Sequence, residues 1–147
     1  MKGLTIVRNF VTLALLLTFL IVLPAARADE TNQAIKVTFD QPVQIPGRAL
    51  PAGTYWFVMV DINEHQMVSI FNADRTTLYA TLLTIDAERR QPASDAAFTF
   101  AERGSSQNQA IVTWFYPGRT TGHEFLYPKQ VQSELAKDKK FTIVAGK

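Results

Sequence analysis

The feature that most constrains this chain is a succession of short apolar runs, each separated from the next by a turn signal. The runs are rich in β-branched and aromatic residues, which is typical of strands, and the gaps between them leave no room for the crossover helices that parallel strands need. The expected strands are 34–39, 51–61, 66–71, 78–85, 96–102, 110–116, 123–127 and 141–146, with an edge strand or irregular crossover over the proline-rich 42–51. We therefore expect an all-β fold, an antiparallel β-sandwich or partly closed barrel of about seven to nine strands.

One short stretch near the C-terminus departs from this pattern. Pro128 suits the first turn of a helix, and the segment after it, KQVQSELAKDKK, has no run of β-branched residues. Val131 and Leu135 lie four positions apart, which places them on one narrow apolar stripe. The sequence predicts a short surface helix over about 128–137.

The first 28 residues have the pattern of an export signal peptide. Lys2 and Arg8 precede an apolar run, 10–23, and a small-x-small step ends at Ala28. The run is shorter than the ~20 residues of a membrane span, and no cysteine follows that could carry a lipid. We expect cleavage after Ala28 and one exported β-sandwich domain, 29–147, periplasmic or extracellular and without a membrane span. The alternative is an uncleaved N-terminal anchor.

Signal removal changes the charge balance of the chain. The full sequence holds 15 Lys+Arg against 13 Asp+Glu. The signal takes away three basic residues and no acidic one, which leaves 12 basic against 13 acidic and a net charge of −1. Binding to nucleic acid depends on a basic surface, so we expect no nucleic-acid partner. The chain has no cysteine, so disulfides, thiol chemistry and cysteine-ligated metals are excluded and packing must supply the stability.

The stretch PAGTYWFVMVD, 51–61, is apolar on both faces. Strand alternation puts Tyr55 and Phe57 on one face and Trp56 and Val58 on the other. A sheet with one wet face carries polar residues on that face, so something must cover the second apolar face. Our favoured interpretation is a cover from within the chain, by the helix, the proline-rich crossover or the C-terminal strand. Self-association into a homo-oligomer and a ligand groove are the alternatives.

The ligand interpretation has three candidate residues. In 110–116, alternation puts Trp114 and Tyr116 on the face opposite Ile111 and Phe115. Flat aromatic rings on a sheet stack on sugar rings or hold apolar molecules. The candidate ligand-binding residues are therefore Trp56, Trp114 and Tyr116.

Metal and catalytic signals are weak. The chain has two histidines, His65 and His123. A site of His123, Glu124 and either Asp61 or Glu64 is conceivable, but adjacent strand residues point to opposite faces, and a solvated pair at a loop end is the favoured interpretation. No G-x-S-x-G elbow, Walker loop or dinucleotide fingerprint is present. We expect no catalytic residue, no metal and no cofactor.

Two charge clusters, Glu88-Arg89-Arg90 and Glu102-Arg103, lie at expected strand ends. Salt bridges at loop ends are the favoured interpretation of both clusters. Anion binding is the alternative.

Several sequence blocks occur together in one order: LPAGTYWF, IFNADRTTLYATLL, FTFAER and AIVTWFYPGRTTGHEFLYPK, at 50–57, 70–83, 98–103 and 110–129. With these blocks the chain resembles a group of small exported bacterial proteins that lack an established activity. The resemblance covers most of the chain after the signal. It implies a secreted β-rich domain and supplies no catalytic or binding residues.

These observations favour an exported, non-enzymatic binding or interaction module of the bacterial envelope or exterior, whose partner is an unknown protein or small ligand. One alternative is a small hydrolase or sugar-acting enzyme that works at a groove of the sheet. The other is a lipocalin-like carrier that holds an apolar ligand inside a barrel.

Overall fold

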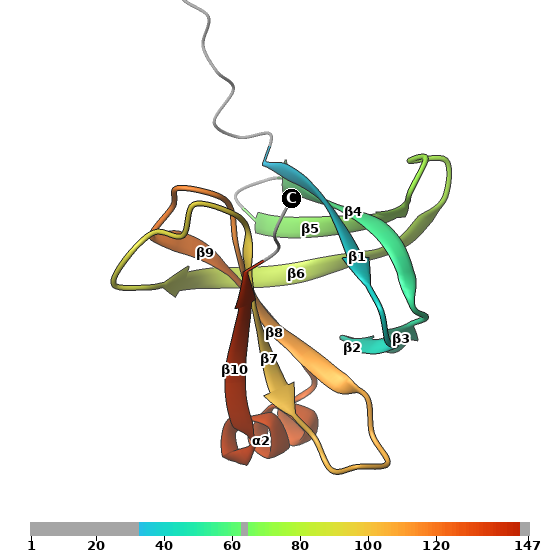
Figure 1. The fold of residues 1–147 in the computed structure, drawn as a ribbon, viewed down its shortest axis with the longest axis vertical. Coiled ribbons are helices and arrows are strands. Elements are labelled where there is room, and N and C mark those ends of the chain that lie inside the picture. The colour runs from blue at the N-terminus through green and yellow to red at the C-terminus, as the bar shows by residue number, and fades with distance from the viewer. Residues whose placement is uncertain (1–32, 63–64, 145–147) are drawn as a thin grey trace, which may run out of the picture.

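The computed structural model describes residues 33–62 and 65–144, with the backbone alone at positions 61, 62 and 65. The strands are β1 (Ala34–Phe39), β2 (Val43–Ile45), β3 (Arg48–Leu50), β4 (Gly53–Ile62), β5 (His65–Asn72), β6 (Leu78–Glu88), β7 (Ala97–Glu102), β8 (Gln109–Phe115), β9 (Thr121–Phe125) and β10 (Lys139–Val144); the helix of the described part is α2 (Lys129–Lys137). The expected all-β class with one short helix near the C-terminus is confirmed (Figure 1). The expected signal, 1–28, lies outside the described residues.

The proline-rich segment forms a hairpin, so the described part has ten strands. Strands β2 and β3 pair in register from Val43 with Leu50 to Ile45 with Arg48. Their two-residue turn ends at Gly47, whose φ of 83° is in the left-handed region that glycine adopts without strain. Both Ile45 and Leu50 are fully buried, because the hairpin turns its apolar side chains into the core.

The strands curl into a barrel that does not close. Eight of the described strands follow the order β1-β4-β5-β6-β9-β8-β7-β10, and each is antiparallel to the next. The long strand β6 joins the two halves, because its first part pairs with β5 and its last part with β9. Strand β2 attaches the extra hairpin by a short parallel pairing with β8. In Figure 1 the strands β1 and β10 stand at the two ends of this order.

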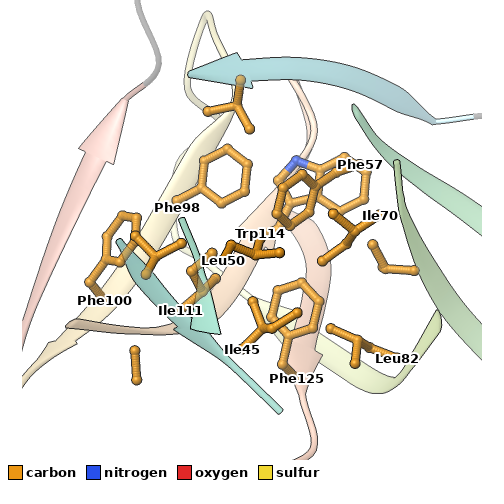
Figure 2. Packing of buried hydrophobic residues seen from close by; sticks show 14 of the residues in the cluster. Ile45, Leu50, Phe57, Ile70, Leu82, Phe98, Phe100, Ile111, Trp114 and Phe125 are labelled. Carbon is orange, nitrogen blue, oxygen red and sulfur yellow. The ribbon is translucent and has the colours of Figure 1, made fainter. Parts of the chain in front are cut away.

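Aromatic side chains fill the interior of the barrel (Figure 2). The ring of Phe57 lies 5.4 Å from that of Phe98 and 6.1 Å from that of Trp114, both edge to face. Phe125 meets Phe57 from a third direction, at 6.4 Å. Such edge-to-face pairs add to the stabilisation from burial, and β4, β7, β8 and β9 each contribute one of these rings. The core therefore ties distant parts of the chain together without disulfides.

A β-bulge on β8 changes which side chains enter the core. The pairing of β7 with β8 skips Val112, which is an extra residue between Ile111 and Thr113. A bulge shifts the alternation of faces by one residue. Ile111 and Trp114 are consequently both in the core and fully buried. The prediction that Trp114 lies on the face opposite Ile111 is wrong for this reason.

The helix α2 packs on the barrel through Leu135, which is buried, and Val131, which is partly buried. Its position is fixed by charge as well. The guanidinium of Arg103 on the β7 side donates to the carboxylate of Glu134 at 2.8 Å, and the ammonium of Lys140 donates to the carbonyl of Leu135 at 3.1 Å. A cation at the C-terminal end of a helix is favourable for its dipole. No helix in the described residues has the length and apolar character needed to cross a bilayer.

Candidate functional site

The two strands at the ends of the barrel order, β1 and β10, border one open groove. The groove has a volume of about 360 Å³, and we call it the seam groove because it lies where the barrel fails to close. Its lining residues are Val37, Thr38, Phe39, Asp40, Gln41, Val43, Phe98, Phe100, Gln109, Phe141 and Ile143. Several of these residues belong to the core, so the groove reaches the apolar interior directly.

Phenylalanine rings from three strands form the apolar part of the seam groove. Phe141 of β10 stacks on Phe100 of β7, with 5.5 Å between ring centroids and 18° between ring planes. Phe39 of β1 meets Phe98 and Phe100 edge to face at 6.1 and 6.3 Å. Phe98 and Phe100 also contact each other at 6.5 Å, so each of the four rings packs against at least one other ring of the groove.

Ile143 shows the effect of the open seam most clearly. Along β10, Phe141 and Ile143 face the groove, whereas Thr142 faces outward and bonds to Thr99 at 3.1 Å. A closed barrel buries its inward-facing residues, yet 49% of Ile143 is exposed. The seam groove therefore presents apolar surface to solvent on the inner side of a strand.

Both borders of the groove are strand edges. Among the described residues, β1 pairs only with β4 and β10 only with β7. Each strand therefore offers a row of backbone N–H and C=O groups that no other described strand engages. Such rows are templates for pairing with another extended chain. The site thus combines an apolar groove with unpaired backbone on either side.

The structure does not bring the three predicted ligand residues together on one surface. Trp114 is fully buried beneath the sheet and contacts Phe57, so it offers no surface to a ligand. Trp56 lies on the opposite face of β4, partly exposed. Tyr116 follows β8 and is half-buried against the core. A groove shared by Trp56, Trp114 and Tyr116 is therefore not formed.

A turn of the chain itself lies over the ring of Trp56. The guanidinium carbon of Arg75 lies 3.8 Å from the ring centroid, and the indole N–H donates to the carbonyl of Ala73 at 3.1 Å. Arg75 has a φ of 59°, which is uncommon for a residue with a side chain. The side-chain oxygen of Asn72 accepts hydrogen bonds from the backbone of the same turn. The cation–π contact stabilises this arrangement.

The favoured interpretation of an internal cover holds in part. Trp56 is covered from within the chain, but by the turn at Arg75 and not by one of the three segments that we expected. The helix α2 contributes Leu135 to the core itself. Farther along the outer face, Leu83, Ile85 and Leu126 remain exposed. Self-association through this face therefore stays a prediction.

His123 and Glu124 lie on opposite faces, as the strand geometry predicts. His123 is buried at 5.3 Å from the ring of Trp114, and its Nε2 is 3.3 Å from Gln33 Oε1. Burial lowers the pKa of His123, against a smaller raising effect of Asp86. Glu124 is half-exposed on the outer face. No group of three metal-ligating side chains occurs in the described part, and the side chains of Asp61, Glu64 and His65 lie outside it.

The seam groove is not among the sites predicted from the sequence. Alternation correctly places Val37 and Phe39 on one face of the first strand, but nothing in the sequence says that β1 and β10 fail to pair. The cue that was available is Phe141 in a C-terminal strand between lysines and other apolar residues. It marks an edge strand with an apolar inner face.

Comparison with protein-family models, curated proteins and solved structures finds no match for this chain. The resemblance to small exported bacterial proteins therefore stays a prediction, and the function must be argued from the sites themselves.

Proposed function

We propose that this chain is an exported, non-enzymatic binding module that accepts an extended peptide segment of a partner protein in the seam groove. The observation that carries the proposal is that Ile143 is exposed although it faces the inside of the barrel, on a strand, β10, with one edge that no other described strand pairs with. A peptide that adds to a free sheet edge gains main-chain hydrogen bonds, and pockets for its alternate side chains give specificity.

The chemistry of the groove favours a peptide over a free apolar ligand. Fatty acids and similar ligands fill apolar space but satisfy no backbone N–H or C=O groups along β1 and β10. The volume of about 360 Å³ is at the lower end of the roughly 300–1,000 Å³ range of ligand pockets. It suits a few side chains of an extended segment. The barrel interior is filled by Phe57, Phe98 and Trp114 (Figure 2), whereas a lipocalin-like carrier keeps that interior for its ligand.

Export is the second part of the proposal. The pattern at 1–28 is that of a signal peptide. Gln33, the first described residue, accepts a hydrogen bond from the backbone N–H of Met59 at 2.7 Å. Cleavage after Ala28 keeps Gln33 and this hydrogen bond in the mature chain.

Selection from a displayed library of random linear peptides tests the binding proposal. We expect peptides with alternating apolar residues to bind the purified protein and to slow amide hydrogen exchange along β1 and β10. Ile143→Glu is expected to weaken binding by about tenfold or more, because the carboxylate must lose water in an apolar groove.

Val144→Glu is the matched control. Val144 is the neighbouring residue on the same strand, 46% exposed against 49% for Ile143, and it points to the opposite face. Its substitution should change the affinity by less than about twofold. The proposal is wrong if selected peptides bind Ile143→Glu as tightly as the native chain, or if laurate binds in the groove while no peptide does.

A further inference from the structure

A second groove, distinct from the seam groove, lies on the outer face of the barrel. It has a volume of about 390 Å³, and we call it the outer groove. The pairing of neighbouring strands aligns one row of residues across its floor: Thr142 on β10, Thr99 on β7, Thr113 on β8 and Glu124 on β9. Directly paired residues share a face, so three hydroxyl groups and one carboxylate stand side by side.

The loop 89–96 forms one wall of the outer groove. Ala93 packs on Phe115, and the carbonyl of Ala93 accepts a hydrogen bond from the N–H of Gly118 at 2.8 Å. The N–H of Arg89 donates to the carbonyl of Thr120 at 2.9 Å. These bonds fix the loop against the β8–β9 turn. On the other side Glu124 also lines a separate hollow beside α2.

The guanidinium of Arg89 lies over an aromatic ring in this groove and has no carboxylate partner among the described residues. Its central carbon lies 5.3 Å from the ring centroid of Phe115, and its Nη1 is buried with no hydrogen-bond acceptor. Among the described residues the salt bridges involve Arg103 and not Arg89. The predicted salt bridge at a loop end is thus found for Arg103, while Arg89 has none. A buried charged donor without an acceptor is costly.

A second polar atom in the same groove is also unsatisfied. Thr113 Oγ1 is buried and has no hydrogen-bond partner, although the neighbouring Thr99 and Thr142 bond to each other at 3.1 Å. Glu124 makes no ion pair among the described residues. On the face of the sheet that carries Thr113, the cation of Arg89, the unpaired hydroxyl of Thr113 and the carboxylate of Glu124 therefore border one hollow. Buried polar groups are normally satisfied, so the arrangement points to a ligand.

We propose that the outer groove binds a small zwitterion, a molecule with one carboxylate and one ammonium group such as a free amino acid. The ligand carboxylate accepts from the Arg89 guanidinium in a charge-assisted pair, and the ammonium group donates to Glu124. Thr113 supplies a hydroxyl between these two. Asp86 and Glu88 also line the groove. Asp86 pairs with His123 across β6 and β9 and accepts a hydrogen bond from Gln66 at 2.8 Å, and alternation along β6 puts Glu88 on the same face as Asp86. On the face of Thr113 the charged side chains are therefore Arg89 and Glu124, so a zwitterion matches their charges, whereas a phosphate or a simple diamine matches only one.

Isothermal titration of the full chain with serine and γ-aminobutyrate tests this assignment. At least one should bind, and N-acetylserine and serinamide, which each lack one charge, should bind at least about tenfold more weakly. Arg89→Met keeps the stem over Phe115 but removes the charge, and it should abolish binding. Arg90→Ala removes an exposed neighbouring charge and should leave binding unchanged.

Thr113→Val separates ligand binding from folding. Valine matches threonine in shape and removes the unpaired hydroxyl, so the ligand-free protein should melt at the same or a higher temperature while the affinity falls. The proposal is overturned if neither zwitterion binds, if binding survives Arg89→Met, or if glucuronate or inorganic phosphate binds in preference. These readouts are independent of Ile143, so they do not depend on the seam groove.

Discussion

The substitution Gly122→Ala provides a direct test of how closely β8 and β9 approach each other. A Cβ atom at Gly122 would lie 2.5 Å from the carbonyl oxygen of Trp114 and 2.5 Å from Cδ1 of Phe115. Ordinary van der Waals contact begins at 3.4 Å, so about 0.9 Å of movement is needed. The first of these atoms is backbone in the middle of the sheet. Neither strand can give way without disturbing the pairing of β8 with β7.

The expected cost follows from this geometry. Forcing an extra methyl group into a well-packed interior costs about 1–3 kcal/mol, and a clash with backbone belongs at the upper end of that range. We expect Gly122→Ala to lower the free energy of unfolding by about 2–3 kcal/mol. For a domain of this size the melting temperature falls by roughly 8–12 °C. Urea titration and thermal unfolding, both followed by circular dichroism, measure the two quantities.

Gly104→Ala is the matched control for this prediction. A Cβ atom at Gly104 meets nothing within 4 Å, and neither glycine has a φ in the left-handed region. Alanine there should be neutral or stabilising by up to about 1 kcal/mol, because it restricts the unfolded chain. The reasoning about close strand approach is refuted if Gly122→Ala and Gly104→Ala have equal stabilities.

Two further predictions concern buried rings. Burial lowers the pKa of His123 in the folded protein below its ordinary value of 6.5, so the unfolded chain binds a proton at His123 more tightly than the folded chain does. The contribution of neutral His123 to the free energy of unfolding is therefore complete above about pH 6.5, and it is lost as the pH falls through the folded-state pKa. Urea titrations across this range should therefore show a smaller acid loss for His123→Gln than for the native chain; an equal loss would contradict the assignment. Acrylamide should quench the fluorescence of Trp114→Phe, which retains the partly exposed Trp56, more than that of Trp56→Phe, which retains the fully buried Trp114. The opposite order would show that the two tryptophans are assigned to the wrong faces of the sheet.

Much of the fold could be predicted because strand patterns are local. The first strand was expected at 34–39 and is found at Ala34–Phe39, since apolar and polar residues alternate there without interruption. The helix was expected at about 128–137 and is found at Lys129–Lys137, with Pro128 as the N-cap residue just before its first turn. In both cases neighbouring residues supply the whole signal.

The candidate sites could be predicted only in part. Trp114 was expected on an outward face, but the bulge at Val112, which depends on the pairing partner, turns it into the core. Arg89 was expected to pair at a loop end, yet the loop 89–96 folds over Phe115 and keeps its guanidinium away from any carboxylate of the described residues. Both outcomes depend on residues far away in the sequence.

The sequence by itself determined that this chain forms a thiol-free β domain, because the period of its apolar residues and the absence of cysteine are properties of the chain alone. Only the tertiary structure decided that β1 and β10 remain apart and that Thr99, Thr113 and Glu124 align on one face. Register between strands is set by contacts across the whole barrel, and for that reason the location of both grooves cannot be derived from local patterns.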